Sequence, residues 1–243
     1  SSDVCSSDLI ERDARFASDV SHELRSPLMT LAASIEVIEG RRDEMPDRAR
    51  AAVDLLSSDV ARFRTLVEDL LEISRFDAGA VRPNLDELLT AEFVTQAVAV
   101  SSLPGTPVVV EERAENTLIT GDRRRLARVI ANLIDNARIH GGGSARVRVG
   151  VPAADAEITR VRIEVSDSGP GVPDEERRLI FERFARGGGA GRRRDNDGAG
   201  LGLALVAEHV RLHSGSVWVE TGPEGLGSNF VIELPAEDLG DDS

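Results

Sequence analysis

The chain has 243 residues, 41% of them hydrophobic and 30% charged, a balance typical of one or two globular domains. All 29 basic residues are arginines, which excludes a Walker A lysine, a Schiff-base lysine and a lysine general base. The single cysteine excludes an internal disulfide and a cysteine-based zinc site, and the net charge of −14 argues against bulk nucleic-acid binding.

The first nine residues, SSDVCSSDL, resemble a translated sequencing-library adapter. We therefore expect that residues 1–9, including Cys5, are not native protein and have no functional role. We expect the native chain to extend further upstream, so that any sensor or membrane-spanning region would precede residue 10. No apolar run in the sequence itself approaches the roughly 18–20 residues that cross a bilayer.

Residues 10–78 have the pattern of two helices joined by a loop at residues 40–46. The apolar stripe of the first helix consists of Val20, Leu24, Leu28, Leu31, Ile35 and Ile38. A second helix is predicted over residues 47–76, with the stripe Leu56, Val60, Phe63, Val67, Leu70 and Ile73. Two antiparallel helices cannot cover both stripes, whereas two such hairpins can. The sequence therefore predicts an all-α hairpin that forms a homodimeric four-helix bundle through residues 10–78.

Residues 91–235 have a different pattern, in which short strands mix with glycine-rich loops and helices. Strands are predicted at residues 146–149, 161–165, 216–220 and 229–234, and helices at residues 122–139 and 201–213. This grouping favours a mixed sheet with helices on one face, an α+β two-layer sandwich. Residues 79–90 are predicted to be a linker, and residues 236–243 an acidic, solvated tail.

His22 is notable on the first helix because it points away from the apolar stripe. It lies two residues from both Val20 and Leu24, which at about 100° per residue places it on the solvent-facing side. Glu23 supplies a carboxylate beside the imidazole that can hold its tautomer and accept a proton. Pro27 interrupts the same helix at a cost of about 3 kcal/mol, which suggests that the bend is used.

Residues 16–28, FASDVSHELRSPL, resemble the H box of bacterial sensor histidine kinases. The resemblance implies that His22 is the phosphoacceptor and that Glu23 is its activating partner. Family members commonly carry Thr or Asn where this chain has Ser26, and that position orients water for phosphatase activity. Because Ser keeps the hydroxyl, the resemblance leaves phosphatase activity open.

Two asparagines and an aspartate are candidate ligands for a metal ion and a nucleotide. Asn132 and Asn136 lie four residues apart on a predicted helix and so face the same side. Their amide oxygens suit a hard cation such as Mg²⁺, although a structural polar pair would have the same spacing. Asp167 ends a predicted strand and can accept a hydrogen bond from an amino group. Gly169 and Gly171 permit close approach of a ligand, as they also permit an ordinary turn.

Residues 187–200 form a glycine- and arginine-rich segment with almost no apolar residue, typical of a surface lid. The segment leads into Gly198, Gly200, Leu201 and Gly202, where a helix is predicted to begin. Backbone N–H groups at a helix N-terminus bind phosphate. The spacing fits neither a Walker A loop nor a clean dinucleotide fingerprint.

These motifs together resemble the ATP-binding domain shared by histidine kinases, gyrase-type ATPases and related chaperones. Residues 132–137 resemble the N box, 167–171 the G1 box, 181–184 the F box and 198–205 the G2 box. The resemblance implies that Asn136 binds Mg²⁺, that Asn132 lines the same site and that Asp167 takes the adenine amino group. It implies further ATP-binding roles for His140, Gly169, Gly171, Gly198, Gly200, Leu201 and Gly202.

One position departs from the family pattern. Many members have Lys or Arg three residues after the second asparagine, where this chain has Ile139. Arg138 and the lid residues 192–194 are candidate substitutes for the missing phosphate contact. His209 and His213, four residues apart on a predicted helix, fit a structural role better than a metal site because no third ligand is evident.

Together the motifs imply a sensor histidine kinase core that uses ATP and Mg²⁺ to phosphorylate His22. The phosphoryl group would then pass to an aspartate of a response-regulator receiver domain. A gyrase-like ATPase without phosphohistidine, and a dimeric scaffold or phosphatase, are the alternatives. We expect no nucleic-acid partner. By family analogy the parent protein would sit in the inner membrane through its upstream region, with this part in the cytoplasm.

Overall fold

The computed structural model describes residues 24, 26–152, 160–185 and 200–240. The chain divides into two compact units between Arg82 and Pro83. Among the residues described, no helix is long and apolar enough to cross a membrane.

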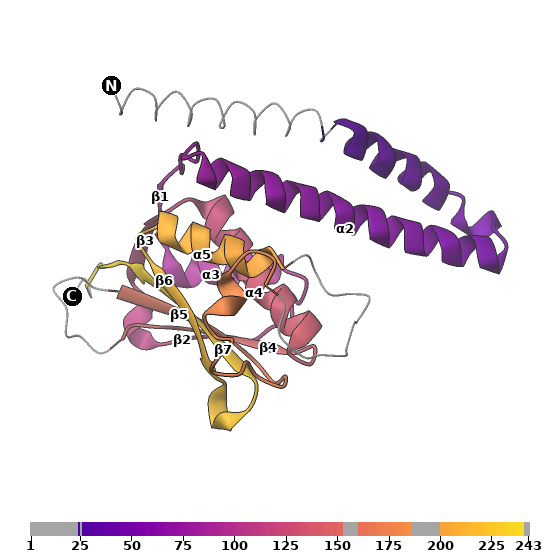
Figure 1. Cartoon of the computed structure of the whole chain (residues 1–243). Helices are drawn as coiled ribbons and strands as arrows, with labels where there is room; N and C mark the ends of the chain where they lie inside the picture. The colour runs from indigo at the N-terminus through magenta and orange to yellow at the C-terminus, as the bar shows by residue number, and fades with distance from the viewer. Residues whose placement is uncertain (1–23, 25, 153–159, 186–199, 241–243) are drawn as a thin grey trace, which may run out of the picture. The chain divides into compact units, whose positions relative to one another are not determined.

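The first unit is a helical hairpin (Figure 1). Residues 26–39 are helical, the short turn η1 (Arg42–Glu44) follows, and α2 runs over Asp47–Asp77. Asp47 opens α2, where an acidic side chain favours the helix start. Arg42 binds both carboxylate oxygens of Asp54, at 2.8 Å from Nε to Oδ1 and 2.6 Å from Nη2 to Oδ2. This fork ties the turn to the second helix.

The predicted apolar stripes of the hairpin are only partly covered. Their buried members are Leu28, Ile35, Val67 and Ile73. Their exposed members are Leu24, Leu31, Ile38, Leu56, Phe63 and Leu70. Exposed apolar side chains along one helix face are typical of a surface that binds another protein element.

The second unit, from Pro83 onward, mixes strands and helices. Its helices are α3 (Thr90–Ala99), α4 (Arg123–His140) and α5 (Gly202–Leu212). Its strands are β1 (Asp86–Leu89), β2 (Val108–Val110), β3 (Thr117–Gly121), β4 (Ala145–Gly150), β5 (Arg160–Asp167), β6 (Ser216–Thr221), β7 (Ser228–Pro235) and β8 (Glu237–Asp238). Three short turns complete it: η2 (Glu112–Ala114), η3 (Leu179–Phe181) and η4 (Pro223–Gly225).

The main sheet has five strands in the order β2-β4-β5-β7-β6. β2 pairs parallel to β4, and the other neighbours are antiparallel, so the sheet is mixed as predicted. Along β5, half-buried and buried residues alternate, as the period of two of a strand requires. A smaller antiparallel sheet has the order β1-β3-β8.

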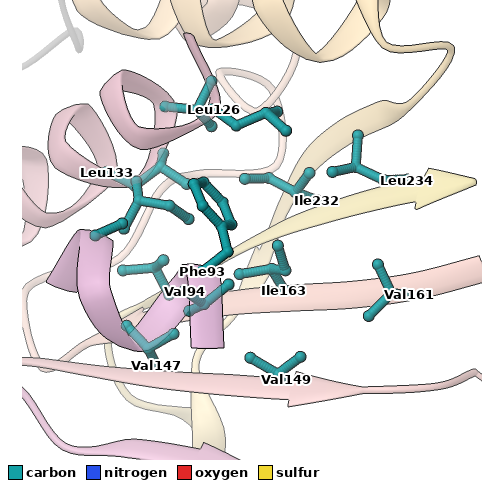
Figure 2. Packing of buried hydrophobic residues seen from close by; sticks show 14 of the residues in the cluster. Phe93, Val94, Leu126, Leu133, Val147, Val149, Val161, Ile163, Ile232 and Leu234 are labelled. Carbon is teal, nitrogen blue, oxygen red and sulfur yellow. The ribbon is translucent and has the colours of Figure 1, made fainter. Parts of the chain in front are cut away.

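The core lies between one face of the main sheet and the helices (Figure 2). The labelled residues are Phe93 and Val94 from α3, Leu126 and Leu133 from α4, and Val147, Val149, Val161, Ile163, Ile232 and Leu234 from the strands. This arrangement is the predicted α+β two-layer sandwich. Its helical layer contains α4 and α5, on which several candidate site residues lie.

The second unit extends beyond its predicted bounds at both ends. β1 lies within residues 79–90, expected to be a linker, and its Leu88 is a buried member of the core. At the other end, Ala236 is buried, and Glu237–Asp238 pair with β3 as β8. The residues directly after 235 are therefore part of the domain and not only a solvated tail.

Candidate functional site

The helix α4 presents the two asparagines on one face. The helix begins after Asp122, whose Oδ1 accepts hydrogen bonds from the backbone N–H groups of Arg124 at 3.1 Å and Arg125 at 3.2 Å. Asn132 and Asn136 are both half-buried. The Nδ2 of Asn132 donates to the carbonyl oxygen of Gly202 at 3.2 Å. The asparagine face of α4 therefore lies beside the first residue of α5.

Asp167 ends β5, and the main chain fixes its carboxylate. Its Oδ1 accepts hydrogen bonds from the backbone N–H of Gly169 at 2.9 Å and of Ser228 at 3.1 Å. Two donors on one oxygen of a buried side chain hold the carboxylate in a single orientation. Oδ2 is then the oxygen with which a ligand amino group can bond.

Glycines surround Asp167 at contact distance. A Cβ at Gly141, the residue after α4, would lie 2.4 Å from the Asp167 Cβ, and one at Gly227 would lie 2.0 Å from the Asp167 carbonyl oxygen. A Cβ at Gly169 would lie 2.7 Å from the Gly141 Cα. Gly171 has a φ of +78°, which favours glycine. The end of α4, the turn after β5 and the β6–β7 connection therefore converge here.

The start of α5 forms another side of the site. Gly200 has a φ of +70°, and its carbonyl oxygen accepts the backbone N–H of Phe184 at 2.9 Å. Leu201 is 1% exposed and anchors this turn, and Gly202 is the first residue of α5. The first N–H groups of a helix lack partners within it and favour an anion such as phosphate.

The other predicted site residues are placed as follows. His140 is exposed and is the last residue of α4, directly before Gly141. Ser26 is an exposed helical residue of the first unit. His22, Glu23, Gly198 and the lid residues 192–194 lie outside the described residues.

Arg138 lies on a different face of α4 from Asn136. Its Nε and Nη2 lie 3.3 Å and 3.2 Å from Oδ1 of Asp135. At about 100° per residue, Arg138 lies about 200° around the helix from Asn136, on a different face. Ile139 itself is half-buried. Of the candidate substitutes, Arg138 thus points away from Asn136 and contacts Asp135 instead.

His209 and His213 do not form the arrangement of a metal pair. Nε2 of His213 lies 2.9 Å from the backbone nitrogen of Asp122, and its Nδ1 lies 2.6 Å from the carbonyl oxygen of His209. Within the described ranges, no group of three or more His, Cys, Asp or Glu side chains is arranged to hold a metal ion. The structural interpretation of this pair agrees with these contacts.

Two carboxyl groups that are not candidate nucleotide or metal ligands, those of Asp122 and Asp54, have lowered pKa values. Burial by itself raises the pKa of Asp122, but the backbone N–H groups of Asn84, Arg125 and Arg124 and the Arg125 charge together lower it. The hydrogen bond and charge of Arg42 lower the pKa of Asp54. Both groups stay ionised at neutral pH and act as structural anions.

Gly141, Gly227 and Ser228 are not among the site residues predicted from the sequence. All three touch Asp167 or its turn. For Gly227 and Ser228 the sequence does indicate a tight connection, because residues 225–228, GLGS, lie between two predicted strands. Only the fold shows that this connection returns to a residue 61 positions earlier.

Two family models match the chain. Residues 12–79 match the model described as the His Kinase A (phospho-acceptor) domain. Residues 121–238 match the model described as the histidine kinase-, DNA gyrase B- and HSP90-like ATPase.

Named relatives agree with both models. The signal transduction histidine-protein kinase AfsQ2 of Streptomyces coelicolor is 37% identical over 233 residues, covering 92% of this chain and 42% of the relative. The sensor histidine kinase MtrB of Mycobacterium tuberculosis is 36% identical over 228 residues, covering 91% of this chain and 39% of the relative. The histidine-protein kinase/phosphatase MprB of a Mycobacterium species is 35% identical over 240 residues, covering 94% of this chain and 45% of the relative. The chain spans less than half the length of these relatives.

Solved structures support the same assignment. Full-length ShkA in complex with AMPPNP has a TM-score of 0.71 at 27% identity, covering 93% of this chain and 46% of that one. The mycobacterial sensor histidine kinase MprB has a TM-score of 0.50 at 27% identity, covering 64% of this chain and 99% of that one.

A helical hairpin of the phospho-acceptor type, followed by an ATPase-type α+β sandwich, defines the core of a histidine kinase. The chain belongs to the sensor histidine kinases of two-component signalling.

Proposed function

We propose that the chain transfers the γ-phosphoryl group of ATP to His22 and then to an aspartate of a response-regulator receiver domain. One observation carries the proposal: within one ATPase-type domain, the asparagine face of α4 bonds to the start of α5 while Asp167 is held by the main chain. The same chain carries the H box within its phospho-acceptor match.

Asp167 is suited to recognise adenine. Its Oδ1 is occupied by two backbone donors, so Oδ2 can accept a hydrogen bond from the adenine amino group. Gly141 and Gly169 leave the surrounding main chain without side chains that would fill the space beside the carboxylate. Gly200, Leu201 and the N-terminus of α5 would receive the phosphates.

The donor set fits Mg²⁺, a hard cation that prefers oxygen ligands. Asn136 offers an amide oxygen on the face of α4 that lies next to α5. Asn132 donates to Gly202 through its nitrogen, so its amide oxygen is directed elsewhere and can line the same site. When bound, Mg²⁺ supplies positive charge that offsets the charge of the phosphates.

The transfer to His22 exchanges one bond for another. A bond forms between an imidazole nitrogen of His22 and the γ-phosphorus, while the bond to the bridging oxygen breaks and ADP leaves. Glu23 accepts the imidazole proton. Catalysis of this type depends mainly on positioning and charge stabilisation. In the second step the phosphorus–nitrogen bond breaks, and an acyl phosphate forms on the receiver aspartate.

Ser26 supports an additional phosphatase activity toward the receiver. It is an exposed helical residue and lies four positions after His22 in the sequence. Its hydroxyl can orient a water molecule against the phosphorylated aspartate. MprB, one of the relatives, is named a kinase/phosphatase.

We propose that the protein acts as a homodimer through residues 10–78. The exposed apolar residues of the hairpin support this, since a second hairpin would bury them in a four-helix bundle. A dimer would also permit transfer within one chain or between the two chains.

Autophosphorylation with γ-labelled ATP and Mg²⁺ tests the proposal, with His22→Gln as the variant and Thr30→Ala as the control, since Thr30 is an exposed helical residue eight positions later in the sequence. We expect acid-labile, alkali-stable label on the native chain and on Thr30→Ala, and none on His22→Gln. ATP hydrolysis without bound label would favour a gyrase-like ATPase. Label that persists on His22→Gln would place the phosphoacceptor elsewhere.

A further inference from the structure

His213 lies at a junction between the two helices that carry the candidate nucleotide site. It follows α5 directly, and its backbone N–H donates to the carbonyl oxygen of Val210 at 3.1 Å. The chain then turns through Ser214, with a φ of +57°, and Gly215, where a Cβ would lie 2.5 Å from the Glu233 carbonyl oxygen. This tight turn fixes the largely buried imidazole at the end of α5.

Each ring nitrogen of His213 meets a backbone group of a different element. Nε2 accepts the backbone N–H of Asp122 at 2.9 Å, and Nδ1 lies 2.6 Å from the carbonyl oxygen of His209. A backbone N–H only donates, so Nε2 carries no proton. A carbonyl oxygen only accepts, so Nδ1 carries one. The contacts therefore specify the neutral Nδ1–H tautomer.

The side chain of Asp122 makes its own contacts, separate from the backbone N–H that meets His213. Its carboxylate is engaged otherwise: Oδ1 caps α4, and Oδ2 accepts the backbone N–H of Asn84 at 3.0 Å. The preceding residue, Gly121, gives the ring room. A Cβ there would lie 3.2 Å from Cδ2 of His213 and 2.5 Å from Cδ1 of Leu126.

The helices α4 and α5 are thus linked at two separate points. One is the bond from Asn132 to Gly202, and the other is the bond from Asp122 to His213. On α4 the two points are ten residues apart, which is about 15 Å at 1.5 Å per residue. Both helices also pack into the core, and the two hydrogen bonds at opposite ends of α5 fix the register in which they pack.

We propose that His213 is a positioning residue for the nucleotide site. Its Nδ1–H tautomer holds the end of α5 on the start of α4, which keeps the phosphate-facing start of α5 in register with Asn132 and Asn136. The consequence for ATP rests on the proposed function, whereas the tautomer does not.

The tautomer is tested by nitrogen-15 NMR of the imidazoles in the 243-residue chain. We expect His213 to show a protonated Nδ1 and a bare Nε2 at neutral pH, and the Asp122 amide to exchange slowly with solvent. A His213 ring with its proton on Nε2, or a rapidly exchanging Asp122 amide, would overturn the proposal. Neither measurement requires ATP to bind.

The positioning role is tested by two matched polar variants and ATP titration calorimetry. In His213→Gln the amide oxygen can take the place of Nε2 and accept the Asp122 N–H. In His213→Asn the side chain is too short to do so but can still donate to the His209 carbonyl. We expect His213→Gln to bind ATP within about threefold of the native chain and His213→Asn to bind about tenfold more weakly.

Equal ATP affinity of His213→Asn and the native chain would overturn the positioning role. Equal weakening in both variants would do the same, because rescue by the longer side chain is what distinguishes a link to Asp122 from general damage to α5. If the native chain itself bound no ATP, the proposed function would fail, and the ring spectrum alone would then decide whether the link exists.

Discussion

The Oδ1 of Asp167 accepts the backbone N–H of Ser228 at 3.1 Å, across 61 residues of sequence. This bond joins the end of β5 to the start of β7. A second backbone donor, Gly169, meets the same oxygen. The main chain therefore pre-organises the carboxylate that we propose for adenine recognition. Ligand binding then loses little side-chain entropy at this residue.

Replacing Asp167 with Asn tests its role in adenine recognition. The variant keeps an oxygen for the two backbone donors but places an amide N–H₂ where Oδ2 stood, opposite the adenine amino group. We expect ATP affinity to fall about 10- to 100-fold, with little change in thermal stability. Titration calorimetry measures the affinity, and Glu164→Gln on the same strand is the control. Native affinity in Asp167→Asn would remove this residue from the nucleotide site.

Replacing Gly141 with Ala tests the close packing behind Asp167. The added Cβ would meet the Asp167 Cβ at 2.4 Å and the Ala137 carbonyl oxygen at 2.6 Å, so the main chain must shift. We expect a loss of about 1–3 kcal/mol in unfolding free energy and weaker ATP binding. Gly105→Ala is the matched control, because a Cβ there meets nothing within 4 Å. Equal stability of the two variants would show that the turn after α4 is adaptable.

Elements with strong local signals could be predicted from the sequence. The second helix was predicted over residues 47–76 and is found over Asp47–Asp77, because its apolar stripe is long and a proline and a glycine flank it. The helix bearing Asn132 and Asn136 is likewise confirmed, with Asp122 as its cap. In both cases the residues that specify the helix lie within the helix or directly beside it.

Features that depend on distant partners were missed. β1 and β8 have four and two residues, and each exists only because β3 offers a pairing edge. The contact between Ser228 and Asp167 has the same origin, since it follows from the pairing of β5 with β7. The direction of Arg138 was foreseeable from helix geometry, but its bond to Asp135 was not.

The position of Ile139 predicts a gain of function. It lies three residues after Asn136, at a position where the resemblance to the family's N box implies a basic residue, while Arg138 is directed to Asp135. We expect Ile139→Lys to strengthen ATP binding by roughly two- to fivefold, as a partly exposed charge pair allows. Arg138→Ala should leave the affinity unchanged, and titration calorimetry compares the two. A marked loss of ATP affinity in Arg138→Ala would mean that Arg138 contributes to ATP binding.

Asp122 predicts a pH-dependent contribution to stability. Its pKa in the folded chain lies below the ordinary value of 3.8, so the unfolded chain takes up the proton first as the pH falls. The stabilisation is therefore fully present above the unfolded pKa and is lost as the pH falls through the folded one. We expect the unfolding free energy of Asp122→Asn to be about 1 kcal/mol below that of the native chain at pH 7. This difference should disappear in acid, where Asp122 becomes protonated.

Urea unfolding of the native chain and Asp122→Asn at pH 7 and below pH 4 measures that gap. Trp218 is the single tryptophan and lies in β6, so its fluorescence reports on the unit that contains Asp122. A gap that widens on acidification would mean that the carboxylate is not stabilised in its charged form.

The exposed stripe of the hairpin predicts the oligomeric state. Phe63 belongs to the predicted stripe of α2 and is 52% exposed, a large apolar surface that a partner hairpin would cover. Ala61 is also exposed but lies about 200° from it around the helix. We expect light scattering to give twice the chain mass of 26.1 kDa for the native protein and for Ala61→Asp, and a shift toward a single chain for Phe63→Asp. Both variants add the same charge to α2, so an effect of the charge alone would appear in both, whereas Phe63→Asp also removes an apolar side chain from the stripe. A dimer that survives Phe63→Asp would place the contact on another surface.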